Sequence, residues 1–149
     1  MKLDSKGYDL IKEFEGFSNR PYKCSANIPT IGYGNTFYPD GKRVSMLDKQ
    51  ITKEYADEIF KNVVDNFAFK VSKLIKSKVT QNQFNALVSF AYNVGIGNLE
   101  KSTLLKLVNI NPNDAMIAKQ FLRWNKAKGK ELKGLTNRRI KESALYYTK

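Results

Sequence analysis

The chain has 149 residues, of which 42% are hydrophobic, and this is enough to bury about two-thirds of its unfolded surface around one core. It contains a single cysteine and no histidine, which excludes an internal disulfide, the usual zinc sites and histidine-based triads, so an enzyme of this composition must use carboxylates as its acid. Lysine and arginine number 26 against 14 acidic residues, and the charge of +12 favours a polyanionic partner: nucleic acid, acidic membrane or the acidic bacterial envelope.

The first element predicted is a short amphipathic helix over residues 5–14, where apolar side chains recur at helical spacing. Glu15 follows at the C-terminal end of this helix, and Gly16 stops it. Residues 17–40 are rich in Gly, Pro, Asn and β-forming residues, which predicts short hairpin strands joined by tight turns.

A long helix is predicted next. Thr52 is a candidate N-cap, and apolar residues then repeat with helical periodicity to about Lys76. We expect this helix to join two lobes of a single domain over residues 1–149. The β lobe would cover about residues 15–50, and the helical lobe would combine residues 52–149 with the N-terminal helix. The fold class predicted is therefore α+β.

The central part of the chain carries local signals for helix ends. Thr80 and Gln83 form a capping-box pair that predicts a helix, and Gly95 and Gly97 mark its end. Ser102 then precedes a short, leucine-rich helical turn.

Two further helices are predicted towards the C-terminus. Asn111, with proline at the next position, predicts a helix that runs to about Trp124, and Gly134 precedes a last helix that ends near Tyr147. The stretch that overlaps their junction is basic and contains glycines. We interpret it as a solvated face, with a functional basic groove near a cleft as the alternative. Its residues are Lys126, Lys128, Lys130, Lys133, Arg138 and Arg139.

Glu15 is the candidate acid. It lies between Phe14 and Gly16, and burial beside apolar groups at a helix end favours the neutral form of a carboxyl. A neutral carboxyl can protonate the leaving oxygen of a glycosidic bond, provided that a second group across the sugar ring activates or positions water. The alternative is that Glu15 is an ordinary surface carboxylate of a helix.

The residues after Glu15 resemble the signature of phage-type lysozymes, glycoside hydrolase family 24. Eight residues separate Glu15 from Cys24, and five more separate Cys24 from Thr30, which opens the run Thr-Ile-Gly-Tyr-Gly. In that family an acidic glutamate is followed at this spacing by aspartate, or in some members cysteine, and then by threonine. The resemblance continues over almost the whole chain, at residues 20–22, 80–87, 93–95, 102–105, Trp124, 134–139 and Glu142.

This resemblance implies a lysozyme-like fold, with a small N-terminal β-hairpin lobe joined by a long helix to a larger helical lobe. It implies an endolysin muramidase that hydrolyses the β-1,4 bond between N-acetylmuramic acid and N-acetylglucosamine in peptidoglycan and so lyses the host cell. By resemblance, Glu15 is the general acid, Cys24 takes the second catalytic position, and Thr30 helps to hold the attacking water. Arg138 is similar to an arginine that pairs with the catalytic acid. The candidates for lining the glycan cleft, which packing and capping explain equally well, are Tyr92, Asn93 and Ser102.

Cys24 stands where the family more often has aspartate. A thiol with a reference pKa of about 8.5 is mostly neutral at pH 7 unless cations such as Arg20 or Lys23 lower its pKa. We expect Cys24 to act as a base, a water-orienting group or a nucleophile, with a small residue of no consequence as the alternative. The resemblance favours inversion of the anomeric centre, whereas a nucleophilic Cys24 would give retention. Asn35 stands where many relatives have histidine, so an ion pair of that histidine is missing.

The expected partner is the glycan strand of peptidoglycan, with no cofactor, no metal, no nucleic acid and no stable membrane insertion, and the chain is expected to be a monomer. No run of eighteen apolar residues and no signal-peptide pattern is present. The resemblance therefore implies synthesis in the cytoplasm of the host bacterium and release to the periplasm or cell wall through a separate membrane pore. Two competing hypotheses are a non-catalytic cationic protein that binds the cell envelope and a lytic transglycosylase, which needs no attacking water.

Overall fold

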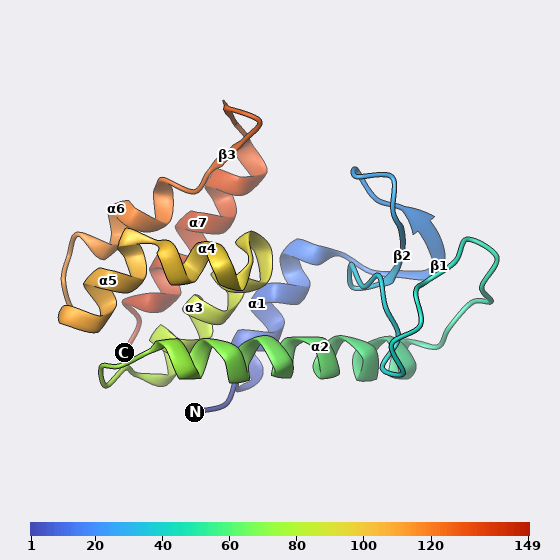
Figure 1. Ribbon diagram of the computed structural model, residues 1–149, viewed down its shortest axis with the longest axis horizontal. Helices are drawn as coiled ribbons and strands as arrows, with labels where there is room; N and C mark the ends of the chain where they lie inside the picture. The colour runs from blue at the N-terminus through green and yellow to red at the C-terminus, as the bar shows by residue number, and fades with distance from the viewer. The chain divides into compact units, whose positions relative to one another are not determined.

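The computed structural model describes residues 1–149 and divides into two compact units. The hairpin unit comprises Ile11–Asn66, and the helical unit comprises Met1–Leu10 together with Phe67–Lys149. Helices α1 (Ser5–Glu15) and α2 (Lys53–Leu74) each contribute residues to both units. Figure 1 shows β1 and β2 in one unit and α3 to α7 in the other, an α+β arrangement as predicted.

Helix α1 begins at Ser5 as predicted and ends one residue later than predicted, at Glu15. The Asp4 carboxylate accepts the backbone N–H of Lys6 at 3.1 Å and so satisfies a free donor at the helix start. The helix ends at Glu15, because Gly16 adopts a left-handed conformation with φ of 69°, which glycine accepts without a steric cost.

The predicted hairpin is formed by β1 (Ser18–Lys23) and β2 (Pro29–Gly32), which pair antiparallel with Tyr22 opposite Thr30. The register is irregular between Ser18 and Tyr22, where a proline removes a ladder donor. The connecting turn begins at Cys24, whose carbonyl accepts the N–H of Asn27 at 2.8 Å. Asn27 has φ of 62°, which asparagine tolerates better than most residues. Cys24 therefore lies at the mouth of a tight hairpin turn.

A small core holds the hairpin unit together. Ile11 from α1, Ile31 from β2 and Ile59 from α2 are fully buried. The Tyr33 ring packs at 5.2 Å from the ring of Phe60 and at the same distance from that of Phe17. Helix α2 begins as predicted, because the Thr52 hydroxyl accepts the N–H of Tyr55 at 3.1 Å.

The core of the helical unit forms where α3 (Gln81–Val94) packs against α7 (Lys133–Tyr146). The rings of Phe90 and Phe121 meet edge to face at 5.7 Å, and Tyr146 contacts Phe121 at the same distance. Both bonds of the predicted capping box at Thr80 are present. Ser102 caps α5 (Thr103–Ile110), again as predicted, whereas the short helix α4 (Ile96–Lys101) between them was not predicted.

Residues at the start of the chain are bound to α3. The amide of Asn85 donates to the carboxylate of Asp4 at 2.7 Å, and the amide of Gln81 donates to the carbonyl of Lys2 at 2.7 Å. The N-terminal residues are therefore part of the helical unit, although the bonded residues are 79 and 81 positions apart in sequence.

The predicted helix from Asn111 to Trp124 is wrong, because only α6 (Ile117–Leu122) forms there. The side chain of Asn111 accepts the N–H of Asn113 at 3.0 Å, and that of Asp114 accepts the N–H of Met116 at 2.9 Å. These local bonds compete with helical hydrogen bonds and hold the segment in turns.

The region around Gly134 also differs from the prediction. A short hairpin forms from β3 (Lys126–Ala127) and β4 (Lys130–Glu131), and α7 begins at Lys133, so Gly134 lies inside the helix. No helix of the structure has the length and apolar content needed to cross a membrane.

Candidate active site

Glu15 is held by the last turn of α1. Lys12, one turn earlier, forms an ion pair of 3.0 Å with Asp57 on α2 and lies 4.9 Å from the centre of the Tyr33 ring. Burial alone would raise the pKa of Asp57, but its hydrogen bonds to Lys12 and Tyr33 and the neighbouring lysine charges lower it overall. Asp57 is therefore an anionic anchor that fixes the end of α1 within the hairpin unit.

The carboxylate of Glu15 lies directly against the backbone of Gly34. A Cβ atom added at Gly34 would approach Oε2 of Glu15 to 2.7 Å, which is shorter than any ordinary contact. Gly34 also has φ of 80°, a conformation that other residues rarely adopt. The glycine that ends the Thr-Ile-Gly-Tyr-Gly run thus provides space for the candidate acid, and Glu15 and this run share one site.

Tyr22 lies within electrostatic range of both Glu15 and Cys24. Burial raises the pKa of the Tyr22 hydroxyl above its usual value, and the negative charges of Glu15 and Cys24 raise it further. Tyr22 is also the β1 residue opposite Thr30. Its phenol remains protonated at neutral pH, so it can donate a hydrogen bond within the site.

Cys24 is a partly exposed free thiol whose pKa is lowered. The largest cause is a hydrogen bond from the backbone of Ile28, followed by one from the backbone of Ala26 and one from the side chain of Thr30. The cations considered from the sequence, Arg20 and Lys23, are not among the causes. The hairpin turn itself directs its donors at the sulfur, and this favours the thiolate.

Thr30 is almost fully buried beside this turn. Its hydroxyl donates to the carbonyl of Ile28 at 2.8 Å and is also a partner of the Cys24 sulfur. A hydroxyl carries one proton, so it can donate to the carbonyl or to a thiolate, but not to both at once. The protonation state of Cys24 and the orientation of the Thr30 hydroxyl are therefore coupled.

Replacement of Thr30 by valine is expected to raise the pKa of Cys24, because valine keeps the shape of the side chain but removes the hydroxyl that stabilises the thiolate. The rate of Cys24 alkylation by iodoacetamide, followed against pH, measures this pKa. Ser25→Ala, an exposed change in the same turn, serves as the control. An unchanged alkylation profile in Thr30→Val would contradict the assigned hydrogen bond.

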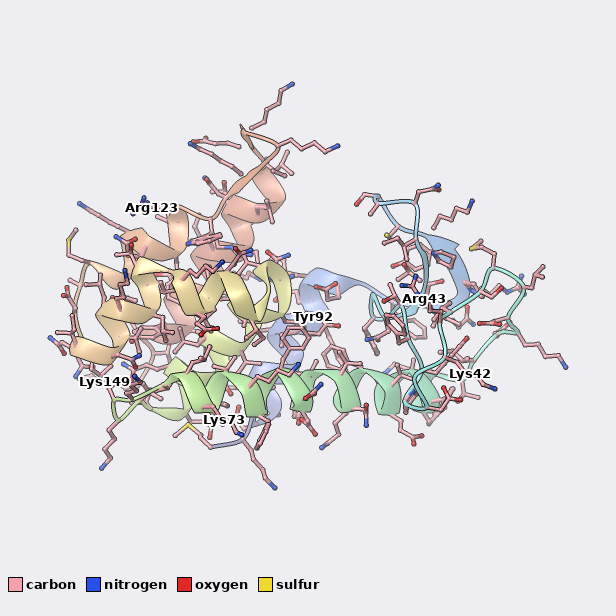
Figure 2. All side chains as sticks on the ribbon, in the orientation of Figure 1. Lys42, Arg43, Lys73, Tyr92, Arg123 and Lys149 are labelled. Carbon is pink, nitrogen blue, oxygen red and sulfur yellow. The ribbon has the colours of Figure 1, made fainter.

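The other predicted site residues belong to the helical unit. The Tyr92 ring packs at 5.2 Å from that of Phe67, and Figure 2 shows it between α3 and α2. Asn93 accepts a hydrogen bond from Arg139. The Ser102 hydroxyl donates to the carbonyl of Leu99 at 2.6 Å and accepts the N–H of Leu105 as the N-cap of α5. The structure thus shows packing at Tyr92 and capping at Ser102, whereas Asn93 lies at an exposed position.

Arg138 belongs to a buried charge cluster with Arg139 and Glu142. Its guanidinium donates to Glu142 at 3.3 Å and to the carbonyl of Ser89 at 3.2 Å, while Arg139 pairs with Glu142 at 2.8 Å. Arg138 and Arg139 are thus buried, and the prediction that they belong to a solvated basic face was wrong.

The cluster carries two cations for one carboxylate. Burial raises the pKa of Glu142, although the charges of Arg139 and Arg138 and the bond from Ser89 act in the opposite direction. Burial also lowers the pKa of Arg139 to about 10, so this guanidinium is still charged at neutral pH. The shared carboxylate fixes the positions of both arginines on α7.

Sequence reasoning missed the contribution of Tyr22 and the contact between Glu15 and Gly34. Only the glycine in the Thr-Ile-Gly-Tyr-Gly run signalled a close backbone approach. Asn35, noted for replacing a histidine, is buried and forms a backbone bridge with Ile31 at 2.8 and 2.9 Å. No group of three or more histidine, cysteine, aspartate or glutamate residues is arranged to hold a metal ion.

Comparison with known proteins identifies the family. The family model for phage lysozyme matches residues 12–142. The endolysin of Bacillus phage B103 is 43% identical over 150 residues, which cover 99% of this chain but 55% of that protein. The endolysin of Salmonella phage P22 is 36% identical over 146 residues, 98% of each chain. The structure of the endolysin from Escherichia coli O157:H7 phage FAHEc1 matches with a TM-score of 0.90 at 43% identity, covering 99% of this chain and 94% of that one.

The chain therefore spans about half the length of its Bacillus phage relatives and nearly the whole length of the P22 relative. The range matched by the family model includes both the candidate acid, Glu15, and Glu142 of the buried cluster on α7. The chain belongs to the phage lysozyme family.

Proposed function

We propose that this chain is an endolysin muramidase that hydrolyses the bond between N-acetylmuramic acid and N-acetylglucosamine in bacterial peptidoglycan. The observation that carries the proposal is the placement of Glu15, whose carboxylate lies against Gly34 in the same compact unit as Cys24 and Thr30. Membership of the phage lysozyme family supports it, as does the name endolysin shared by relatives that cover this chain from end to end.

The proposed reaction uses Glu15 as the general acid. Its proton passes to the glycosidic oxygen as the bond from that oxygen to the anomeric carbon breaks. A water molecule held by Cys24 and Thr30 attacks the anomeric carbon from the opposite face and passes its proton to the thiolate of Cys24. Exchange with solvent then returns one proton from the thiol to the Glu15 carboxylate. This route inverts the anomeric centre.

Product analysis tests the proposal. Digestion of purified peptidoglycan is expected to release fragments with a reducing N-acetylmuramic acid end that carries one oxygen atom from solvent, detected by mass spectrometry in labelled water. An anhydro-muramic end would contradict hydrolysis and indicate a lytic transglycosylase. The first anomer formed, read by proton NMR, is expected to be inverted, and a retained anomer would instead make Cys24 a nucleophile.

The non-catalytic envelope-binding alternative is not favoured, because the relatives that match the whole chain are endolysins. We propose further that residues 1–149 act as one lysozyme domain and as a monomer, with glycan strands and no nucleic acid as the partner. Synthesis in the host cytoplasm, followed by passage through a separate membrane pore, would bring the enzyme to the cell wall. Tyr92, Asn93, Ser102 and Arg138 remain candidates for glycan contacts or for pairing with Glu15.

A further inference from the structure

The net charge of the chain is confined to one unit. Residues 11–66 contain 8 basic and 8 acidic residues, so the hairpin unit is formally neutral. Residues 1–10 and 67–149 contain 18 basic and 6 acidic residues, so the helical unit carries the whole charge of +12. The unit that holds Glu15, Cys24 and Thr30 thus contributes nothing to the attraction of a polyanion at long range.

Within the helical unit the charge is concentrated again. Residues 119–133 contain six basic residues and a single acidic one, Glu131. All six cations are exposed, and none of them takes part in an ion pair. We call them the basic hairpin surface, and they are Lys119, Arg123, Lys126, Lys128, Lys130 and Lys133.

Three of these cations line a depression between the end of α6 and the β3–β4 hairpin. These three are Lys119, Arg123 and Lys126, and the rest of the lining is Leu122, Asn125 and the single acidic residue, Glu131. Figure 2 shows Arg123 at the surface of this unit and long nitrogen-tipped side chains that project from the hairpin into solvent. A concave basic surface of this kind admits a flexible chain, whereas a flat bilayer cannot enter it.

The turn between β3 and β4 places Lys128 at an exposed position. Lys128 has φ of 52° and Gly129 has φ of 79°, which are the two left-handed positions of a tight two-residue turn. At the first position of such a turn, which Lys128 occupies, asparagine is usually preferred. A lysine in this strained position, beside like charges that repel one another, lowers stability unless an anion binds.

We propose that the basic hairpin surface binds phosphodiester polymers of the bacterial envelope, of the teichoic-acid class. Five of the six cations are lysines, which act as hydrated point charges on phosphate and lack the fork geometry of arginine that reads planar groups. Nucleic acid is less well suited, because stacking of bases needs an exposed aromatic face. The neighbouring Trp124 is only partly exposed, and its ring packs edge-on against that of Phe90 at 5.6 Å. The inference takes the bacterial envelope as the site of action from the proposed function, but it does not depend on hydrolysis by Glu15.

The experiment compares two variants of the full chain with equal charge. The test variant carries Lys126→Gln, Lys128→Asn, Lys130→Gln and Lys133→Gln, where asparagine preserves the turn. The control variant carries Lys70→Gln, Lys73→Gln, Lys76→Gln and Lys78→Gln, which are exposed lysines on α2 and just after it, with Lys73 labelled in Figure 2. Each variant lowers the net charge from +12 to +8.

Binding to immobilised poly(glycerol phosphate) is measured over a series of salt concentrations. The test variant is expected to bind about tenfold or more weakly at low salt and to show a shallower dependence on salt, since each phosphate contact releases counterions. The control variant is expected to stay close to the wild type. Equal weakening of both variants would overturn the proposal, because overall charge would then explain binding.

Two further arms identify the polymer and separate this proposal from the enzymatic one. Single-stranded DNA of equal phosphate number and vesicles of phosphatidylglycerol are measured with the same variants. Tighter binding of either probe, lost in the test variant alone, would overturn the assignment to envelope polymers. On peptidoglycan stripped of phosphate polymers, the test variant is expected to release fragments at the wild-type rate. Loss of that activity in a folded test variant would assign the lysines to the glycan site and also overturn the proposal.

Discussion

Replacement of Glu15 by glutamine is expected to lower the rate of peptidoglycan solubilisation by about 10² to 10⁴-fold, the usual contribution of a general acid. Glutamine has the same size as glutamate and fits in the same way against Gly34, where a Cβ would already be too close to Oε2. The fold and the buried contacts of α1 are therefore kept. An amide cannot give up a proton to the glycosidic oxygen, so the loss is expected in kcat and not in binding of the wall.

The matched control is Glu58→Gln, which removes one carboxylate from an exposed position on α2 in the same unit. It is expected to leave the rate unchanged. Cys24→Asp is expected to retain activity, because a carboxylate can also hold and deprotonate water at this position. Undiminished lysis by Glu15→Gln, with the fold verified by circular dichroism, would reject the enzymatic mechanism and support a cationic binder.

Replacement of Glu142 by glutamine is expected to lower the free energy of unfolding by about 3 to 5 kcal/mol. Glu142 is fully buried and is the carboxylate that Arg138 and Arg139 share, at 3.3 and 2.8 Å. Without its charge, two guanidinium groups would remain buried with no counterion. Because domains of this size are stable by only about 5 to 15 kcal/mol, the loss is a large fraction of the total.

Urea unfolding followed by tryptophan fluorescence measures the change, and Trp124 in the helical unit reports it. Glu100→Gln, at an exposed position of α4, is the control and is expected to change stability by less than about 0.5 kcal/mol. Ser89→Ala removes the 2.6 Å hydrogen bond to Glu142 and is expected to cost an intermediate amount, about 1 to 2 kcal/mol. Similar stabilities for Glu142→Gln and Glu100→Gln would show that the cluster is not an ion-pair network.

The sequence predicted those parts of the fold that depend on local interactions. The caps at Thr52, Thr80 and Ser102 bond to backbone groups only three residues away, so their pattern is complete within a short window. The same locality explains the error at residues 111–116. Asparagine and aspartate signal either a helix start or a turn, and here the side chains of Asn111 and Asp114 stabilise turns.

The candidate site was predictable to a lesser extent. The order of Glu15, Cys24 and Thr30 was readable from spacing, because it resembles a family pattern. The hydrogen bonds to the Cys24 sulfur were not, since backbone donors from Ile28 and Ala26 depend on how the turn closes. Burial of Arg138 and Arg139 was also missed. Their contacts with Ser89 and Asn93 join α7 to α3, and such long-range contacts cannot be recognised from the order of charges along the sequence.

The discontinuous helical unit has a consequence for biosynthesis. The tertiary hydrogen bonds of Lys2 and Asp4 are to side chains on α3, so the first ten residues cannot complete their packing until that helix has been translated. The hairpin unit is one uninterrupted stretch and has all its contacts available earlier. Vectorial folding would thus assemble the surroundings of Glu15 before the helical unit that receives the N-terminus.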